Sequence, residues 1–203
     1  MKDFNLIKWL GANSFRTSHY PYSEELMDQA DEQGIVVIDE CPAVALNSFD
    51  STLLTLHKQV VNEMIQRDKN RPSVVMWSIA NEPHSENNTS KPYFEEVINL
   101  VKSLDIVRPT TAAINRPCDI EYLGSLIDVI MINKYFGWYQ NLGITATITS
   151  DLIDMISHWY QKHKKLLIIS EYGAESISGF HQVCLRTIHF KIFVFDRLYF
   201  EFN

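Results

Sequence analysis

Short apolar runs alternate along this chain with longer segments in which apolar residues recur every three or four positions. The short runs are apolar at almost every position, which is typical of parallel strands buried on both faces. Six of them predict strands, at residues 13–18, 35–38, 73–80, 110–115, 129–132 and 166–169. The longer segments predict helices at residues 3–10, 23–34, 50–69 and 92–104 and from residue 150 onward. Strands and helices in strict alternation predict a parallel sheet with helices on its outer side.

Several helix ends carry their own signals. Asp3 and Asp50 precede apolar periodic segments and are good N-caps. Gly11 and Gly34 follow such segments, where a glycine commonly ends a helix. Pro92 is placed to open the fourth helix.

Polar side chains come directly after the apolar run of nearly every predicted strand. They are Arg16, His19, Asp39, Glu40, Asn81, Glu82, Asn115, Asn133, Tyr135 and Glu171. In a (β/α)8 TIM barrel the carboxyl ends of all strands meet at one rim, which carries the active site. The pattern therefore predicts an α/β protein of the TIM-barrel type. A doubly wound open sheet is the alternative, but it usually carries a glycine-rich phosphate turn after an early strand, and this sequence has none.

Length and composition refine this prediction. The chain has 203 residues, 46% hydrophobic and 21% charged, which suits one soluble globular domain. A full barrel usually needs about 250 residues, so the chain is slightly short for one and we expect an incomplete barrel. No apolar run reaches the ~18 residues of a membrane span. The net charge of −7 argues against nucleic acid as a partner and gives no attraction to an anionic membrane.

Cysteine content and the two ends of the chain add further expectations. Cys41, Cys118 and Cys184 are odd in number and far apart, so they predict neither a disulfide framework nor a zinc site. The first residues lack the apolar core and cleavage site of a secretory signal, so no signal peptide is expected. Residues 183–203 crowd aromatic side chains into a segment of no clear period. We interpret residues 1–182 as the partial barrel and residues 183–203 as an unrelated tail that arose from an error in the gene model. The alternative is that residues 183–203 form an eighth strand and helix.

Glu82 and Glu171 form the candidate catalytic pair. Retaining hydrolysis of a glycosidic bond needs two carboxyl groups about 5 Å apart, one protonated and one ionised. Their environments must separate their pKa values. The opposing interpretation is that glutamates on a rim are structural ion-pair partners. Spacing in the sequence does not decide between the two.

Five motifs resemble glycoside hydrolase family 2. Residues 71–83 (RPSVVMWSIANEP) resemble its acid/base signature, and residues 169–175 (ISEYGAE) resemble its nucleophile signature. Residues 15–21 (FRTSHYP), 34–40 (GIVVIDE) and 133–139 (NKYFGWY) resemble the β-glucuronidases of that family. The motifs lie in family order and cover roughly residues 3–182. The β-galactosidases normally carry a histidine-containing run after the nucleophile, which this chain lacks.

The resemblance implies roles for individual residues. Glu82 would be the general acid/base and Glu171 the nucleophile. Asn81 would bind the sugar 2-hydroxyl, and Tyr135 would keep the nucleophile ionised. Supporting roles are implied for three more residues: His19 and Asn133 would touch the sugar or line its subsite, and Arg16 would support the carboxylates from beneath.

Competing structural roles are open for several residues. On this interpretation Arg16 and Asp39 are buried structural partners. Trp77, which lies in the middle of a strand, belongs to the core and is not a platform for a sugar. Glu40, Asn115 and Glu175 would at most stand behind the reacting groups.

The implied activity is that of a retaining exo-β-glucuronidase. It would act by double displacement, without metal or organic cofactor, on terminal glucuronides of glycosaminoglycan fragments or small conjugates. Family members are commonly tetramers, and the animal enzymes are lysosomal or extracellular.

The resembling enzymes also carry parts that we expect to be absent here. Two β-sandwich-type domains and a first barrel strand precede this region in the family. An eighth strand with an Asn-x-Lys motif for the glucuronate carboxylate should follow Gln182. The alternative hypothesis is therefore a truncated, inactive relative.

Overall fold

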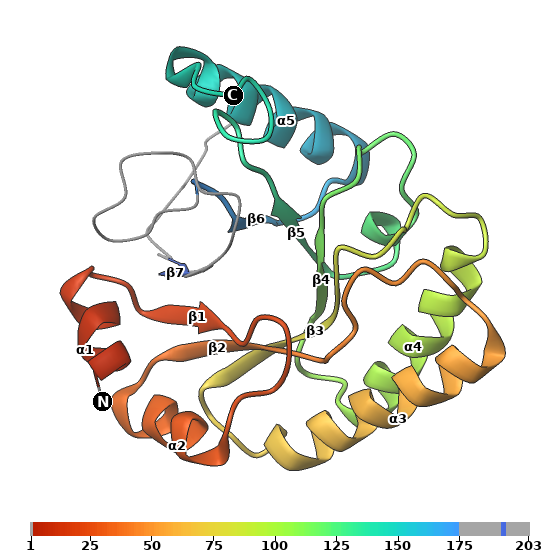
Figure 1. The fold of residues 1–203 in the computed structure, drawn as a ribbon. Helices are drawn as coiled ribbons and strands as arrows, with labels where there is room; N and C mark the ends of the chain where they lie inside the picture. The colour runs from red at the N-terminus through yellow and green to blue at the C-terminus, as the bar shows by residue number, and fades with distance from the viewer. Residues whose placement is uncertain (1, 175–191, 194–203) are drawn as a thin grey trace.

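A curled sheet of parallel strands forms the centre of the computed structural model, which describes residues 2–174 and 192–193 (Figure 1). Its strand order is β6-β5-β4-β3-β2-β1-β7. Strands β1 to β6 pair in parallel and follow the chain around the curve. Their bounds are Ser14–Arg16, Val36–Glu40, Val74–Asn81, Thr110–Ile114, Val129–Asn133 and Leu167–Glu171. The short β7, Ile192–Phe193, pairs antiparallel with β1.

Helices cover the convex side of this sheet (Figure 1). The α-helices α1 to α5 span Lys2–Trp9, Glu24–Gln33, Ser51–Asp68, Ser90–Leu104 and Ile148–His163. Two short 3₁₀ helices, η1 at Leu123–Ser125 and η2 at Thr145–Thr147, complete the described elements. Between β4 and β5 the connection carries only η1, so this part of the wall has no α-helix.

The predicted fold class, an incomplete (β/α)8 barrel, is confirmed. The six predicted strands are present as neighbours in chain order, and helices lie on one side, which excludes the doubly wound alternative. Strand β7 falls within residues 183–203, for which the sequence left open an eighth strand and helix as the alternative to an unrelated tail. The rest of that segment, and with it the interpretation of the tail, lies outside the described residues.

The predicted helix ends are correct in part. Asp50 caps α3, with one carboxylate oxygen accepting from the backbone N–H groups of Thr52 and Leu53 at 2.9 and 3.0 Å. Gly34 ends α2 in a left-handed conformation with φ 67°. The prediction for Asp3 is wrong, because α1 begins at Lys2 and Asp3 lies in its first turn. An acidic residue also favours that position through the helix dipole, so the two placements give the same sequence signal.

Two further helix starts lie earlier than predicted. Helix α4 begins at Ser90, two residues before Pro92. Proline is tolerated there because the first N–H groups of a helix have no intrahelical acceptor. Helix α5 begins at Ile148 rather than residue 150.

Two layers of side chains face the concave side of the sheet. The lower layer is apolar and consists of Ile38, Ala113 and Met131, with Met76 and Ile168 packed against them. Side chains alternate along a strand, so a residue two positions further on faces the same side. Those positions hold Glu40, Ser78, Asn133 and Ser170. A polar layer therefore lies above the apolar one, toward the carboxyl ends of the strands.

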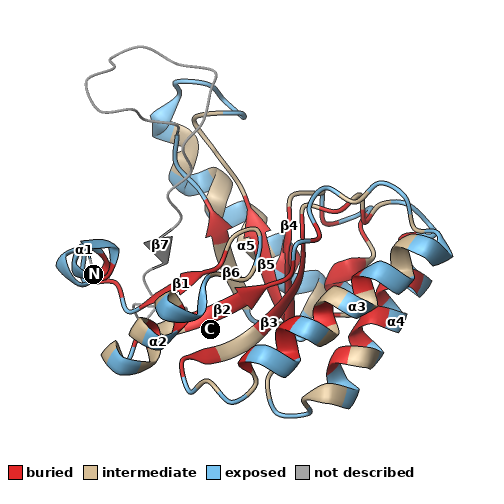
Figure 2. Cartoon of the chain, turned by 60° about the horizontal axis from the view of Figure 1, so that its bottom comes forward, coloured by how far each residue is buried: buried red, intermediate tan, exposed pale blue. Residues whose placement is uncertain are grey.

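The larger core lies between the sheet and the helices. Figure 2 shows the buried residues along the strands and on the inner faces of α3 and α4. Trp77 is fully buried there, and its indole N–H donates to Asp105 Oδ2 at 3.1 Å. Its assignment to the core is therefore correct. Among the described helices, none combines the length and apolarity that a bilayer crossing requires.

Candidate active site

Arg16 lies at the centre of the polar layer. It is the last residue of β1 and only 1% exposed. Its Nη1 donates to both carboxylate oxygens of Glu40, at 2.8 and 2.6 Å, and to Asn81 Oδ1 at 3.3 Å. Its Nη2 donates to Glu171 Oε1. One guanidinium thus holds two buried carboxylates, a geometry for which its planar donors are suited.

Glu171 ends β6 and is 4% exposed. Arg16 donates to one of its carboxylate oxygens, and the Tyr135 hydroxyl donates to the other. A positive charge and a hydroxyl donor both favour the ionised carboxylate. This is the state that a nucleophile requires.

Glu82 follows β3 in a different setting. Its backbone is left-handed, with φ 48°, and its N–H donates to Ala113 O at 2.7 Å. A non-glycine residue in this conformation costs on the order of 1–3 kcal/mol, and such residues concentrate at active sites. The carboxylate accepts from Asn133 Nδ2 at 2.7 Å and from Asn115 Nδ2 at 2.9 Å. Both donors are neutral amides, and the Lys134 ammonium lies near enough to act on Glu82 through its charge. The guanidinium of Arg16, in contrast, donates directly to Glu171.

A continuous chain of polar contacts connects the two glutamates. Asn133 Nδ2 lies 3.3 Å from Asn81 Oδ1, the same oxygen that accepts from Arg16. Glu82, Asn133, Asn81, Arg16 and Glu171 therefore contact one another in sequence. The structure brings both predicted carboxylates to one rim.

Irregularities in the sheet contribute to this arrangement. The β3–β4 register shifts between Ser78 and Asn81, and the β5–β6 register shifts so that Asn133 pairs with Glu171. Bulges of this kind re-aim side chains next to active sites.

Two serines in the polar layer were not among the predicted site residues. Ser78 Oγ donates to Glu40 Oε2 at 2.7 Å, and Ser170 Oγ donates to Asn133 Oδ1 at 2.6 Å. The second contact leaves the Asn133 amide nitrogen directed at Glu82. The available signal was strand alternation, because each serine stands two positions after an inward apolar residue.

The remaining predicted residues lie near the edge of the site or behind it. His19 is one-third exposed, with Nδ1 3.6 Å from Glu40 Oε1. Tyr135 packs edge-on against Tyr139, with ring centroids 5.2 Å apart. Burial lowers the pKa of Lys134, and the nearby carboxylate of Glu82 opposes this by raising it to a smaller extent. Glu175 lies outside the described residues.

Asp39 faces away from this network. Its Oδ1 accepts from the Thr17 hydroxyl at 2.9 Å. Burial, followed by the nearby carboxylate of Asp68, raises the pKa of Asp39 to about 7. Asp39 is therefore a buried structural residue, as the structural interpretation of the sequence predicts.

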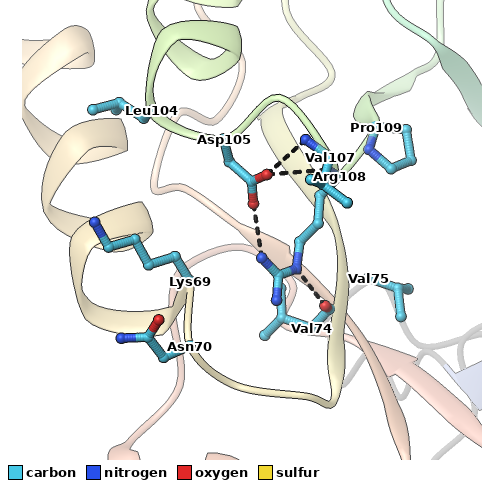
Figure 3. Close-up of a pocket in the computed structure, with 9 residues that line it drawn as sticks. All are labelled: Lys69, Asn70, Val74, Val75, Leu104, Asp105, Val107, Arg108 and Pro109. Atoms are coloured by element: carbon cyan, nitrogen blue, oxygen red, sulfur yellow. Dashed lines mark hydrogen bonds and ion pairs between the residues drawn. The ribbon is translucent and has the colours of Figure 1, made fainter.

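A cavity of about 520 Å³ lies at the opposite end of the strands (Figure 3). Val74 at the start of β3 and Pro109 before β4 contribute to its lining. Two of its charged groups pair with each other, since Arg108 donates to Asp105 Oδ2 at 2.7 Å; Arg108 also donates to Val74 O at 2.7 Å. In a barrel this end serves stability, so the cavity is separate from the candidate active site.

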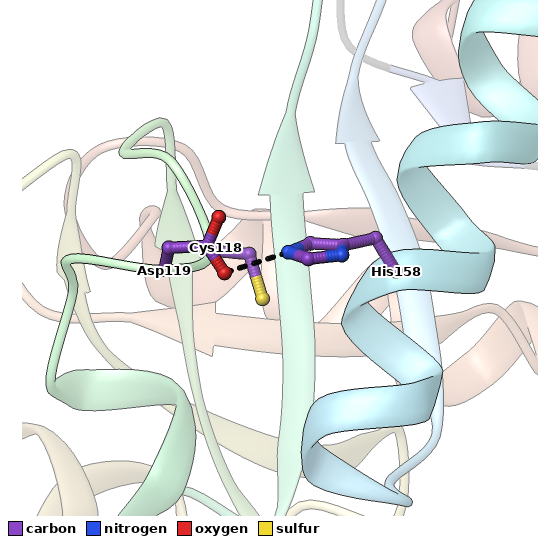
Figure 4. Close-up of side chains that lie close together, drawn as sticks. All are labelled: Cys118, Asp119 and His158. Carbon is purple, nitrogen blue, oxygen red and sulfur yellow. Dashed lines mark hydrogen bonds and ion pairs between the residues drawn. The ribbon is translucent and has the colours of Figure 1, made fainter.

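One cluster of possible metal ligands occurs among the described residues. Cys118, Asp119 and His158 lie outside the rim, between the β4–β5 connection and α5 (Figure 4). They contribute nothing to the two glutamates.

Comparison with known proteins agrees with this geometry. Residues 1–192 match the TIM barrel domain of the glycosyl hydrolases of family 2. The chain belongs to this family. Among curated family 2 relatives, the β-glucuronidases of mouse and human are 48% and 49% identical over 185 residues. The match covers 90% of this chain and 28% of each relative, so the chain spans little more than a quarter of their length.

Solved family 2 structures have the same fold. A β-glucuronidase from an uncultured Clostridium superimposes with a TM-score of 0.85 at 48% identity, covering 89% of this chain and 33% of the other. The β-D-glucuronidase of Dictyoglomus thermophilum gives a TM-score of 0.84 at 44% identity with the same coverage. The predicted resemblance to family 2 and its β-glucuronidases is confirmed.

Proposed function

We propose that this chain is the catalytic barrel of a retaining β-glucuronidase, with Glu171 as nucleophile and Glu82 as general acid/base. The contrast between the two carboxylates carries the proposal. Glu171 contacts a guanidinium and a phenol hydroxyl, whereas Glu82 contacts two neutral amides. The guanidinium charge favours the ionised form of Glu171, which suits this residue to the role of nucleophile.

In the first step, Glu171 attacks the anomeric carbon of the sugar. The bond from that carbon to the aglycone oxygen breaks, and the proton of Glu82 passes to the departing oxygen. Arg16 and Tyr135 hold the attacking carboxylate in one orientation. Asn81, which Arg16 and Asn133 both contact, would bind the sugar 2-hydroxyl, a contact that strengthens in the transition state.

In the second step, Glu82 acts as the base. It takes a proton from water, the resulting hydroxide oxygen bonds to the anomeric carbon, and Glu171 leaves as a carboxylate. Both steps use carboxyl groups alone. Two displacements on the same carbon retain its configuration.

A terminal β-D-glucuronide is the proposed substrate class. The support comes from the relatives described above, which are named β-glucuronidases, and from one of Ruminococcus gnavus in complex with uronic deoxynojirimycin at 38% identity. Glycosaminoglycan fragments and small conjugates both present such a terminal sugar.

An inactive barrel is the second candidate. The observation in its favour is that β6 is the last strand on its side of the described sheet, so one edge carries no pairing partner there. An edge of this kind presents unpaired backbone groups.

Hydrolysis of 4-nitrophenyl β-D-glucuronide by the purified chain tests the proposal. We expect turnover to fall about 10²–10⁴-fold in Glu82→Gln, the range of general acid–base catalysis, and at least as far in Glu171→Gln. A 2,4-dinitrophenyl glucuronide has a leaving group that departs without protonation. With this substrate the first step should recover in Glu82→Gln, whereas Glu171→Gln should stay inactive. Glu63→Gln, an exposed glutamate on α3, is the matched control and should keep full activity.

Two results contradict the proposal. Ordinary turnover in both active-site variants would refute the assignment of the glutamates. A chain that unfolds cooperatively by near-ultraviolet circular dichroism, yet releases no nitrophenol, would establish the inactive alternative.

A further inference from the structure

One group of ligating side chains takes no part in the proposed hydrolysis. Cys118 and Asp119 lie on the connection from β4 to η1, and His158 lies on α5. One ligand atom from each residue lies within 4.8 Å of the other two. His158 Nε2 is 2.8 Å from Asp119 Oδ1, and Figure 4 shows the three side chains meeting between the loop and the helix.

We propose that Cys118, Asp119 and His158 form a zinc-binding site, with water as the fourth ligand. Thiolate, imidazole and carboxylate are the three ligand types that zinc takes in proteins, usually in tetrahedral geometry. A thiolate also disfavours calcium and magnesium, which prefer oxygen ligands throughout.

The geometry requires only a small closure. Zinc–ligand bonds of roughly 2.0–2.3 Å place tetrahedral ligand atoms about 3.3–3.8 Å apart. Asp119 and His158 have side chains that are 74% and 51% exposed, so they are free to rotate toward the thiol. Cys118 is 5% exposed and remains the fixed member of the set.

Charged groups lie around Cys118. Burial raises the pKa of its thiol to about 11; Lys162 lowers this pKa, and Glu121 and Asp119 raise it. Lys162 is also engaged, because it donates to the Cys118 carbonyl. When the zinc–sulfur bond forms, the S–H bond breaks and its proton passes to solvent. Two negative ligands then balance the two positive charges of the ion.

Zinc at this position would join two separate parts of the wall. The β4–β5 connection has no α-helix, and the metal would tie it to α5. Bound zinc should therefore raise the free energy of unfolding, as any ligand of the folded state does.

Titration with Co²⁺ and Zn²⁺ tests the site. We use Cys184→Ser as the parent, because Cys184 lies outside the described residues, while Cys41 is fully buried in the core. Co²⁺ should give a sulfur-to-cobalt charge-transfer band, and Cys118→Ser should abolish it. His158→Ala should weaken Zn²⁺ binding at least about tenfold, because it removes one of three protein ligands.

A matched control sharpens the experiment. His84→Ala removes an imidazole that pairs with Glu86 at 3.1 Å, a similar surface pair without a thiol, and should leave Zn²⁺ affinity unchanged.

Three outcomes overturn the proposal. The first is a cobalt complex of the parent without the charge-transfer band. The second is a Cys118→Ser variant that binds Zn²⁺ as tightly as the parent. The third is an equal loss of affinity in His84→Ala and His158→Ala, which would show non-specific surface binding.

Discussion

Replacing Asp39 with asparagine should stabilise the fold near neutral pH and change it little near pH 4. Asp39 is fully buried on β2, where it accepts from Thr17 and lies near the carboxylate of Asp68. Asp68 in turn accepts from Arg67 and Arg71 at 2.6 and 2.8 Å. Asparagine has the same shape and remains neutral beside Asp68 without taking a proton from solution.

The magnitude follows from the two states of Asp39. Its pKa is raised to about 7 in the folded chain, mainly by burial. In the unfolded chain an aspartate has a pKa of about 3.9. Its contribution to stability is thus complete below pH ~3.9 and is lost as pH rises toward 7, because only the unfolded chain releases the proton. Roughly three pKa units correspond to about 4 kcal/mol, so Asp39→Asn should gain up to that amount at pH 7.

His57 has the opposite dependence. Its Nε2 lies 2.8 Å from Ile79 O and its Nδ1 lies 2.9 Å from the Tyr93 hydroxyl. Burial lowers the pKa of His57 to about 4, against about 6.5 when unfolded. Its contribution is present above pH ~6.5 and is lost as pH falls through 4. In the parent chain the two slopes nearly cancel, and Asp39→Asn should expose a loss of about 1.4 kcal/mol per pH unit on acidification.

Urea unfolding at several pH values measures both effects. The free energy of unfolding of Asp39→Asn itself contains the His57 slope. The difference between Asp39→Asn and the parent isolates Asp39, because all other titrations cancel in it. Asp154→Asn, an exposed carboxylate on α5, is the control and should give a difference near zero throughout. A difference for Asp39→Asn that stays constant from pH 4 to 7 would show that the folded state does not retain the proton, and the reasoning would fail.

Three further predictions concern single side chains. Arg16→Met leaves the carboxylates of Glu40 and Glu171 buried without their shared cation. Urea unfolding should show that the free energy of unfolding falls by about 3–5 kcal/mol, and a fall of less than 1 kcal/mol would contradict the ion-pair network. Asn115→Ala removes an amide that donates to Glu82 at 2.9 Å. It should lower turnover of 4-nitrophenyl glucuronide about tenfold, and an equal effect on the dinitrophenyl substrate would show that Asn115 does not act through the acid function of Glu82. Gly124→Ala places a Cβ 2.8 Å from Glu121 Oε1 and 3.0 Å from Trp159; thermal unfolding should show about 1–3 kcal/mol of destabilisation, and unchanged stability would mean that this contact relaxes freely.

The sheet was accessible from the sequence because buried parallel strands have a local signal. Each of the runs ending near Glu40, Asn81, Asn133 and Glu171 is apolar almost throughout, and each forms a strand at that place. The rule that carboxyl ends of barrel strands meet at one rim then places distant residues together. Glu82 and Glu171, 89 positions apart by their numbering, follow from these two steps.

The contacts within the site were less accessible, because they depend on register. Asn81 and Glu171 contact Arg16 across strands whose pairing shifts by bulges, and no local pattern specifies such a shift. The same holds for the cluster at Cys118 and His158. Its members lie on a loop and a helix, and only the packing of α5 beside the β4–β5 connection brings them together.

The composition of the polar layer is better explained by function than by folding. One step below it, equivalent inward positions hold Ile38, Met76 and Met131, which pack without charge. Continuing that apolar layer through Glu40, Ser78 and Asn133 would avoid the desolvation of buried carboxylates, and replacing buried ion pairs in this way often stabilises a protein. The chain instead places one arginine between two carboxylates and holds Glu82 in a left-handed backbone conformation. Departures from folding rules that converge on one point mark a functional site, and here they converge on the two glutamates.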